Sequence, residues 1–349
     1  MQIALIADTH YGCRNDNPFW YDYQKKFIDQ VFLPYLKEHK IHNVIHLGDL
    51  VERRKFINFK SATRLRQDFL EPLFKAEVNC SFICGNHDAF YKSSLSINAL
   101  RELQVSDSFM RDETNPFEII DSPKLSWYDG QNKILMVPWI CSGNRDEILN
   151  SIEKENARYC IGHFDFKGYE ETKGRLSKHG EDYSQFAKFD QVFSGHYHIR
   201  SHNHNINYIG SAFEFTWDDL DSPRGFAVLE TTTGEVSYVE NPFHMFTMLD
   251  YDEENLPDLA RVENTYVKVN VKNRGSEVKF RNFESKIYEA GAIAITFIEK
   301  PLQTSQSDIA IQFSDTKEVF IEEIKALELP NQGRIMEDFD VLYAEAMAS

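Results

Sequence analysis

The chain has 349 residues, of which 42% are hydrophobic and 13% aromatic, so it can bury a large core and is not a disordered protein. Its formal net charge of −17 argues against a free-standing nucleic-acid binder, because cationic side chains normally supply most of the affinity for phosphates. No apolar run approaches the ~18–20 residues of a membrane-spanning helix. The length favours one large domain with a smaller appendage.

The cysteines and the amino terminus indicate a cytoplasmic protein. The five cysteines form no C-x-x-C pair and are odd in number, which fits reduced, buried thiols. The apolar residues 1–6 have no basic region before them and run directly into Asp8. We therefore expect a core strand there and not a signal peptide.

Three short apolar runs in the first 90 residues have the pattern of strands buried on both faces. They cover residues 2–7, 41–47 and 80–84. Residues 23–39 and 60–75 between them carry apolar side chains at helical spacing, with Pro34 as a kink or boundary. This alternation predicts a layered α/β fold with functional groups at the carboxyl ends of the strands.

From residue 124 onward the predicted strands are shorter. Strands are predicted at 134–137, 159–161, 192–193, 208–211, 226–229 and 236–239, with a helix at 145–155. Residues 167–184 are polar and contain three glycines, so we expect a mobile loop at the rim of a site. We place the end of this first domain at residue 242.

Residues 243–300 are predicted to form a small β-α-β cap domain. The strands are expected at 266–271 and 292–298, around a helix at 276–290. Residues 301–313 are then a linker, and 314–349 carry two amphipathic segments. Each apolar stripe fits a helix that either packs on its own protein or lies in a partner's groove.

Ligand-type side chains follow five of the predicted strands. They are Asp8, His10, Asp49, Asn86, His163, His196 and His198. Seven such groups are too many for one four-coordinate ion and fit two metals that share one carboxylate, for which Asp49, standing alone on its loop, is the candidate. Oxygen and imidazole ligands without thiolate favour Mn, Fe or Zn over Ca or Mg.

His87 directly follows the candidate ligand Asn86, and both side chains cannot readily reach the same ion from so tight a turn. We expect His87 to act as a donor or acid toward a phosphate or leaving oxygen, supported by a neighbouring carboxylate such as Asp88. The alternative is a structural or helix-capping histidine.

The motifs D-x-H, G-D-x-x-E-R, G-N-H-D, G-H and G-H-x-H, in this order, resemble those of the calcineurin-like metallophosphoesterase superfamily. The wider pattern, including Pro138-Trp139 and Pro223-Arg224-Gly225-Phe226, resembles the SbcD-type DNA-repair nucleases in their compact phage form. The likeness is specific over residues 1 to about 230. It implies a layered metallophosphoesterase fold, with β-sheets flanked by helices, a small α+β cap and a helical tail.

The resemblance also implies roles for the residues. One metal would be held by Asp8, His10, Asp49 and His198. The other would be held by Asp49, Asn86, His163 and His196. His87 would be the catalytic histidine.

By the same resemblance the protein would be a Mn²⁺-dependent double-strand exonuclease and single-strand endonuclease of DNA recombination and repair, with Mg²⁺, Fe or Zn as other candidate metals. Residues 243–300 would cap the DNA. An SMC-like, SbcC-type coiled-coil ATPase would bind the helices of 314–349, around a homodimer of this chain within a heterotetramer. A phage-encoded protein would work in the cytoplasm of its bacterial host.

One departure from the relatives lies beside the predicted metals. Relatives often have a histidine three residues after the shared aspartate, where this chain has Glu52, so that histidine's role cannot be transferred. The next residues, Arg53, Arg54 and Lys55, are candidate DNA contacts or an ordinary solvated face. His202 and His204 extend the H-x-H pattern, but we expect them to be exposed loop residues.

Two other functions remain open from the sequence. A small-molecule phosphodiesterase or phosphatase could use the same metal core, although it would not need the region beyond residue 242. A non-catalytic scaffold for the ATPase or DNA is opposed by the intact ligand set.

Overall fold

The computed structural model describes residues 1–106, 109, 115–127, 130 and 132–299, together with positions 333, 336 and 339. It divides into one unit, Met1–Glu299, and a second, Lys300–Ser349. The three described positions of the second unit, Gly333, Met336 and Phe339, are helical. The predicted linker and the rest of the predicted tail helices lie outside the described residues.

The first sheet has six strands in the order β16-β15-β1-β2-β3-β6. Its parallel strands are β1 (Gln2–Ile6), β2 (Asn43–His46), β3 (Asn79–Ile83) and β6 (Phe117–Ile120). The antiparallel strands β15 (Gly225–Glu230) and β16 (Val236–Glu240) extend the sheet beside β1. The predicted strands of the first 90 residues are therefore confirmed.

The second sheet is also six-stranded, in the order β13-β14-β12-β9-β8-β7. Its strands are β7 (Lys124–Trp127), β8 (Lys133–Val137), β9 (Tyr159–Gly162), β12 (Gln191–Ser194), β13 (Ser201–Asn203) and β14 (Ile206–Tyr208). The four central strands run parallel, and β7 and β13 are antiparallel edges.

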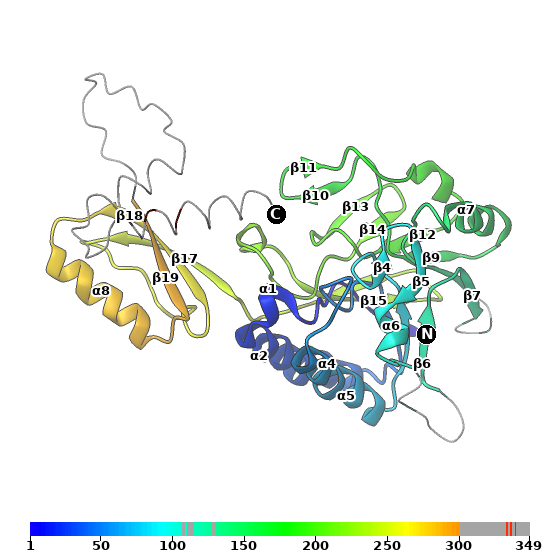
Figure 1. Cartoon of the computed structure of the whole chain (residues 1–349), viewed down its shortest axis with the longest axis horizontal. Helices are drawn as coiled ribbons and strands as arrows, with labels where there is room; N and C mark the ends of the chain where they lie inside the picture. The colour runs from blue at the N-terminus through cyan, green and yellow to red at the C-terminus, as the bar shows by residue number, and fades with distance from the viewer. Residues whose placement is uncertain are drawn as a thin grey trace. The chain divides into compact units, whose positions relative to one another are not determined.

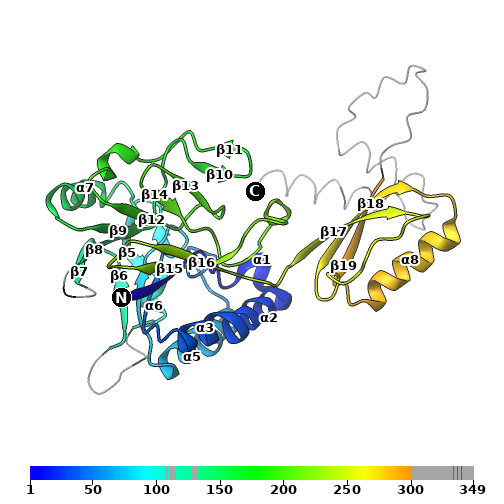
Figure 2. The same cartoon turned by 180° about the vertical axis from the view of Figure 1, so that it is seen from behind.

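The two sheets pack face to face, and helices cover their outer faces. In β1, Ile3 and Leu5 lie in the core between the sheets, whereas Ala4 and Ile6 face the helices; all four are 0% exposed. This double burial explains why the strand is apolar without alternation. Figure 1 shows α2, α4 and α5 together on one flank and α7 on the opposite side, and Figure 2 shows the same layers from behind.

The helices of the first flank contain a widened π turn before each internal proline. The helical elements are α1 (Cys13–Asp16), α2 (Pro18–Phe27), η1 (Ile28–Phe32), α3 (Leu33–Glu38), α4 (Phe59–Leu65), η2 (Arg66–Leu70), α5 (Glu71–Lys75) and α6 (Ala99–Glu102). Pro34 and Pro72 lack an amide hydrogen and would clash with the carbonyl four residues earlier. The π turns relieve this conflict, with the amides of Leu33 and Glu71 bonding five residues back.

Two predicted segments are corrected. The helix expected from residue 23 begins at Pro18, because Asn17 caps it by accepting from the Phe19 amide at 3.0 Å. The expected loop at 167–184 contains a hairpin of β10 (Glu170–Thr172) and β11 (Arg175–Leu176), followed by the 3-10 turn η3 (Tyr183–Phe186). The helix α7 (Arg145–Lys154) agrees with its prediction.

Residues beyond 242 build a third sheet with its own core. Its parallel strands are β17 (Phe246–Asp252), β18 (Tyr266–Asn273) and β19 (Ala294–Glu299), crossed by α8 (Glu277–Glu289). Phe280, Phe283 and Ile287 of α8 pack on the alternating apolar residues of the sheet. The remaining short elements are β4 (Ala89–Tyr91), β5 (Ser94–Asn98) and η4 (Trp217–Asp219). The predicted strands and helix are all present, and β17 adds one more strand.

Two predictions from composition can be compared with the structure. All five cysteines are free and buried. Within the described ranges, no helix is both long and apolar enough to cross a bilayer.

Candidate metal centre

The loops after β1, β2, β3, β9 and β12 converge at one edge of the two sheets, because all five strands deliver their carboxyl ends there. Backbone hydrogen bonds tie neighbouring loops together. The Asp8 amide donates to the Gly48 carbonyl at 3.1 Å, and the Gly195 amide donates to the Gly162 carbonyl at 3.1 Å. All seven predicted ligands lie on these loops.

The backbone at this edge is strained at four of the predicted ligands. Asp8, His10, Asp49 and His196 have φ values of 52°, 47°, 55° and 85°. Non-glycine residues in this left-handed region cost roughly 1–2 kcal/mol each. Such a concentration is typical of a site whose side chains must point in directions that ordinary loops do not provide.

One group of ligand atoms centres on the Asn86 side chain. Its Oδ1 lies 2.9 Å from His163 Nε2 and 2.9 Å from His196 Nδ1. Asp49 Oδ2 lies 3.3 Å from His163 Nε2. Asp49, His163 and His196 could hold a metal ion, since their ligand atoms all lie within 4.8 Å of one another.

The lone pairs of the nitrogen and oxygen atoms in this group are arranged so that they could bind a cation. His163 Nδ1 donates to the Leu47 carbonyl at 2.7 Å, so in the neutral ring Nε2 presents a lone pair toward the oxygens of Asn86 and Asp49. Lone pairs that face each other repel unless a proton or a metal lies between them. Two glycines permit this close approach: a Cβ on Gly48 would lie 2.4 Å from His163 Nδ1, and one on Gly85 would lie 2.2 Å from Asp49 Oδ1.

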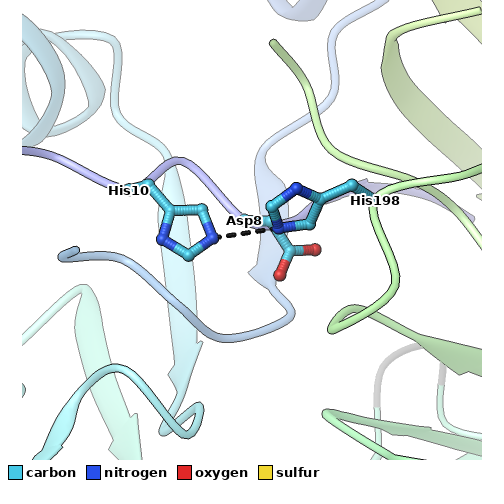
Figure 3. Close-up of side chains that lie close together, drawn as sticks. All are labelled: Asp8, His10 and His198. Carbon is cyan, nitrogen blue, oxygen red and sulfur yellow. Dashed lines mark hydrogen bonds between the residues drawn. The ribbon is translucent and has the colours of Figure 1, made fainter. Parts of the chain in front are cut away.

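A second group consists of Asp8, His10 and His198, which Figure 3 shows with the two imidazoles pointing toward one another beside the Asp8 carboxylate. His10 Nε2 lies 3.1 Å from His198 Nε2. Two ring nitrogens at this distance again need a proton or a cation between them. These ligand atoms also lie within 4.8 Å of one another.

Asp49 lies between the two groups. Its Oδ2 is 3.3 Å from His163 Nε2 in the first group and 3.9 Å from His10 Nε2 in the second. The side chain is almost fully buried. This is the position that a carboxylate shared by two cations requires.

Without a cation, the pKa values of these buried groups are shifted in different directions. Burial raises the pKa of Asp8 to about 7, and the nearby Asp49 charge adds to this. Burial opposes the charged form of Asp49 too, but the charge and hydrogen bond of His163 hold its pKa well below the usual range. Burial lowers the pKa of His196 to about 4, and the charge of His163 reinforces this. Burial likewise lowers the pKa of His198, well below its usual value.

His87 faces the same edge and is held by Glu52 and Asp49. Its Nδ1 lies 2.5 Å from the Glu52 carbonyl oxygen, and its backbone amide donates to Asp49 Oδ1 at 2.7 Å. The His87 and His10 rings meet edge to face, 4.8 Å apart. Both histidines line one cleft, together with Arg14, Glu52 and His198.

Glu52 is a site residue whose role was not evident from the sequence. Its Oε2 lies 2.9 Å from His10 Nδ1, the ring nitrogen that points away from His198. A carboxylate on the outer nitrogen of a metal-binding histidine fixes the ring and raises its basicity. Its spacing of three residues from Asp49 was the available signal.

The hydrogen bonds of Asp88 are to backbone amides, and its predicted support of His87 stays a prediction. Its fully buried carboxylate accepts from the backbone amides of Gly85 at 2.8 Å and Val51 at 3.1 Å. No hydrogen bond or ion pair joins it to His87 in the described part of the chain. Asp88 therefore ties together the loops that carry Asp49 and Asn86.

The candidate DNA contacts lie beside the cleft, but two of the three also have local partners. Arg53 pairs with Asp16 at 2.7 Å and lines the cleft. The Arg54 guanidinium stacks 5.0 Å from the Trp139 ring centre, and Lys55 is exposed. His202 and His204 are exposed as expected, although His202 lies on β13 and not in a loop.

Arg224 is a second residue that sequence reasoning did not place. It is 3% exposed, pairs with Asp219 at 2.7 Å and donates to the His198 carbonyl. It also donates to Ser211 Oγ at 2.6 Å. Arg224 thus fixes the loop that presents His198, and the Pro-Arg-Gly-Phe motif was its only signal.

Comparison with known proteins now decides the family. The family model of calcineurin-like phosphoesterases matches residues 1–200, more than half of the chain. This chain belongs to the calcineurin-like phosphoesterase family. The family predicted from the motifs is confirmed, and phosphoester hydrolysis with two metals is the chemistry of this family.

Two relatives of this phosphoesterase are similar over most of their length. Exonuclease subunit 1 of Enterobacteria phage T4 is 27% identical over 327 residues, which cover 94% of this chain and 91% of the relative. A subunit of the nuclease SbcCD of Staphylococcus epidermidis is 22% identical over 80% of this chain and 78% of its own. An archaeal phosphodiesterase structure matches 69% of this chain and 100% of its own at 12% identity and a TM-score of 0.34, which supports no further conclusion.

Proposed function

We propose that this phosphoesterase is a metal-dependent DNA nuclease that cuts phosphodiesters as a double-strand exonuclease and single-strand endonuclease in DNA recombination and repair. The observation that supports it most is the similarity to two nuclease subunits over 94% and 80% of this chain, which extends past the phosphoesterase domain. The convergence of all seven ligand-type residues at one edge supports the hydrolytic part.

We assign the two groups at this edge to two cations, with Mn²⁺ as the first candidate. Asp8, His10, Asp49 and His198 would hold one, and Asp49, Asn86, His163 and His196 the other. When bound, two such ions would supply a site for the phosphate, a more acidic water and charge stabilisation for the attacking and leaving oxygens.

The residues of the chain supply orientation and a proton. His87 Nδ1 donates to the Glu52 carbonyl and so fixes the ring, and Nε2 of the doubly protonated ring is the nitrogen that would give its proton to the leaving oxygen. Glu52 orients His10 by its side chain and His87 by its backbone. Arg224 and Asp88 keep the ligand loops in place.

We further propose that residues 243–300 cap the bound DNA and that 314–349 bind a coiled-coil ATPase of the SbcC type, with two copies of this chain in the complex. Both relatives are named as subunits, which supports a partner. Co-purification of the ATPase with the full chain, lost on deletion of 314–349, would test this assignment.

Hydrolysis assays test the nuclease directly. A labelled DNA duplex, p-nitrophenyl phosphate and its bis-ester are each incubated with Mn²⁺ or with EDTA. We expect Mn²⁺-dependent cleavage of DNA and little attack on the monoester. Efficient turnover of the monoester with intact DNA would instead identify a small-molecule phosphatase.

A further inference from the structure

Two phenylalanines beside the metal cleft are unusually exposed. Phe56 and Phe59 are 65% and 90% exposed, whereas most phenylalanines of the described chain lie in its cores. Both belong to residues 53–60, Arg-Arg-Lys-Phe-Ile-Asn-Phe-Lys, which hold four cations and no acid in a chain of net charge −17. We call residues 53–60 the cation–phenylalanine segment.

The segment is anchored at both ends, so its exposed rings have a fixed backbone. Arg53 binds Asp16 at 2.7 Å and Asn15 Oδ1 at 3.0 Å. At the other end Ser61 donates to the same Asp16 carboxylate, and the Asn58 side chain accepts from the Lys60 amide at 2.8 Å. Anchoring of this kind reduces the entropy lost when a ligand binds.

The segment continues directly from the metal cleft. Arg53 lines the cleft with His10 and His87, and its guanidinium lies 5.0 Å from the centre of the Phe56 ring. Phe56 therefore lies next to a cation that lines the cleft, and Phe59 follows it three residues later in the chain.

We propose that the cation–phenylalanine segment is a stacking platform for the unpaired bases of single-stranded DNA. Aromatic and cationic side chains gathered in one exposed segment suit a single strand, because any base can stack on a ring while the phosphates meet the cations. Bases within a duplex are already stacked and cannot reach the rings. The platform rests on the proposed nuclease function and specifies that its substrate enters this cleft with a single-stranded end or gap.

The charge of the segment favours a nucleic acid over a second copy of this chain. In a symmetric contact through these residues the cations of one copy would meet those of the other, and of the four only Arg53 has an acidic partner in the described structure, Asp16. Phosphates would instead neutralise them and release counterions.

Binding of fluorescein-labelled oligothymidine to the full-length protein, measured by anisotropy in EDTA, tests the platform. An abasic oligomer with the same phosphates and a blunt duplex serve as matched ligands. We expect Phe56→Ala and Phe59→Ala each to weaken oligothymidine binding about tenfold. We expect changes below about twofold for the abasic oligomer and the duplex, because neither offers free base faces.

Control variants separate stacking from general surface effects. Tyr91→Ala removes another exposed ring, 46% exposed on β4 and outside the segment, and should leave all three affinities unchanged. Phe59→Trp should restore oligothymidine binding that Phe59→Ala loses. Phe59 is almost fully solvated, so its truncation leaves no cavity.

Unchanged oligothymidine binding by both alanine variants would overturn the platform, and so would an equal loss of affinity for the abasic oligomer. A third contradicting result would be sedimentation showing that the variants dissociate a dimer while DNA binding stays constant. The last would assign the rings to a contact between copies. Failure of the nuclease is a separate result, namely no Mn²⁺-dependent cleavage of labelled DNA by the unaltered protein.

Discussion

Charged side chains are buried at the sheet edge that carries the seven candidate ligands, called the edge below, and exposed on the β17-β18-β19 sheet of residues 243–300, called the cap. Asp8 and His163 at the edge are 0% exposed, and four ligand residues there have a left-handed backbone. In the cap the ion pair of Asp250 and Lys272 has side chains 52% and 61% exposed, over a core that is apolar. Burying charged groups at the edge lowers the free energy of unfolding, whereas in the cap the charged side chains lie on the surface, as in most proteins.

This difference predicts that matched substitutions have very different effects in the two regions. At the edge, where water is excluded, each charged group is compensated by its neighbours and by any cation that binds there. In the cap, water screens each charge, and an exposed ion pair contributes little.

The largest effect is expected for Asp49→Asn, which removes the carboxylate that both groups approach. We expect kcat/KM for DNA cleavage to fall by about 10⁴-fold, since both cations lose a ligand. Elemental analysis after dialysis should find fewer than two metal ions per chain. Retention of both ions and of activity would show that Asp49 is not shared.

His87→Ala is expected to lower kcat by about 10²–10⁴-fold, the usual contribution of a positioned proton donor. Metal content should stay unchanged, because both proposed cation sites take their ligands from other residues; a loss of metal would instead assign His87 to the group it forms with His10 and Glu52. His204→Ala, at an exposed histidine, is the control and should keep full activity. A His87→Ala protein that cuts DNA at the unaltered rate would leave His87 as a structural residue.

Glu52→Ala should weaken Mn²⁺ binding about 10- to 100-fold, because it removes the carboxylate beside His10 Nδ1. Glu52→Gln keeps an oxygen at that position and should lose only a few-fold. Calorimetric titration of the metal-free proteins measures both affinities. Equal affinities for all three proteins would exclude an orienting role.

The pH dependence of metal binding has a definite sign. Burial opposes protonation of His10, but its contact with Glu52 and the nearby carboxylates outweigh burial and raise its pKa to about 9. Burial also opposes protonation of His163, but the charge and hydrogen bond of Asp49 raise its pKa to about 9. Both rings are therefore protonated at pH 7 without metal, and a cation must displace these protons. We expect Mn²⁺ affinity to rise with pH by about tenfold per unit for each displaced proton. An affinity independent of pH between 6 and 8 would contradict these protonation states.

The smallest effect is expected in the cap, for Asp250→Asn. The substitution weakens an exposed pair with Lys272 and should lower the free energy of unfolding by at most about 1 kcal/mol. DNA cleavage should be unchanged. Thermal unfolding checks the first result, and a loss of activity would show that the cap surface takes part in catalysis.

The sequence predicted the fold where a single pattern determines it. Continuous apolar strands gave β1, β2 and β3, and alternation gave β18 of the cap. The seven candidate ligands could be predicted to lie together because each follows a strand end, where parallel topology brings loops together.

The parts that were missed depend on contacts between distant residues. Spacing does not show that the Glu52 side chain meets His10, or that the Asp88 carboxylate accepts from the amides of Gly85 and Val51. The hairpin within 167–184 was obscured by its glycines and polar residues, which resemble an open loop. Left-handed φ values at non-glycine ligands are a tertiary effect with no local signal.

The central claim is that one aspartate joins two cation sites, and electron paramagnetic resonance of the Mn²⁺-loaded protein tests it most directly. Two Mn²⁺ ions that share Asp49, about 3.5–4 Å apart, should give the spectrum of an exchange-coupled pair. Asp49→Asn should abolish that coupling. An unaltered protein that binds a single, magnetically isolated Mn²⁺ ion, or none, would contradict the account.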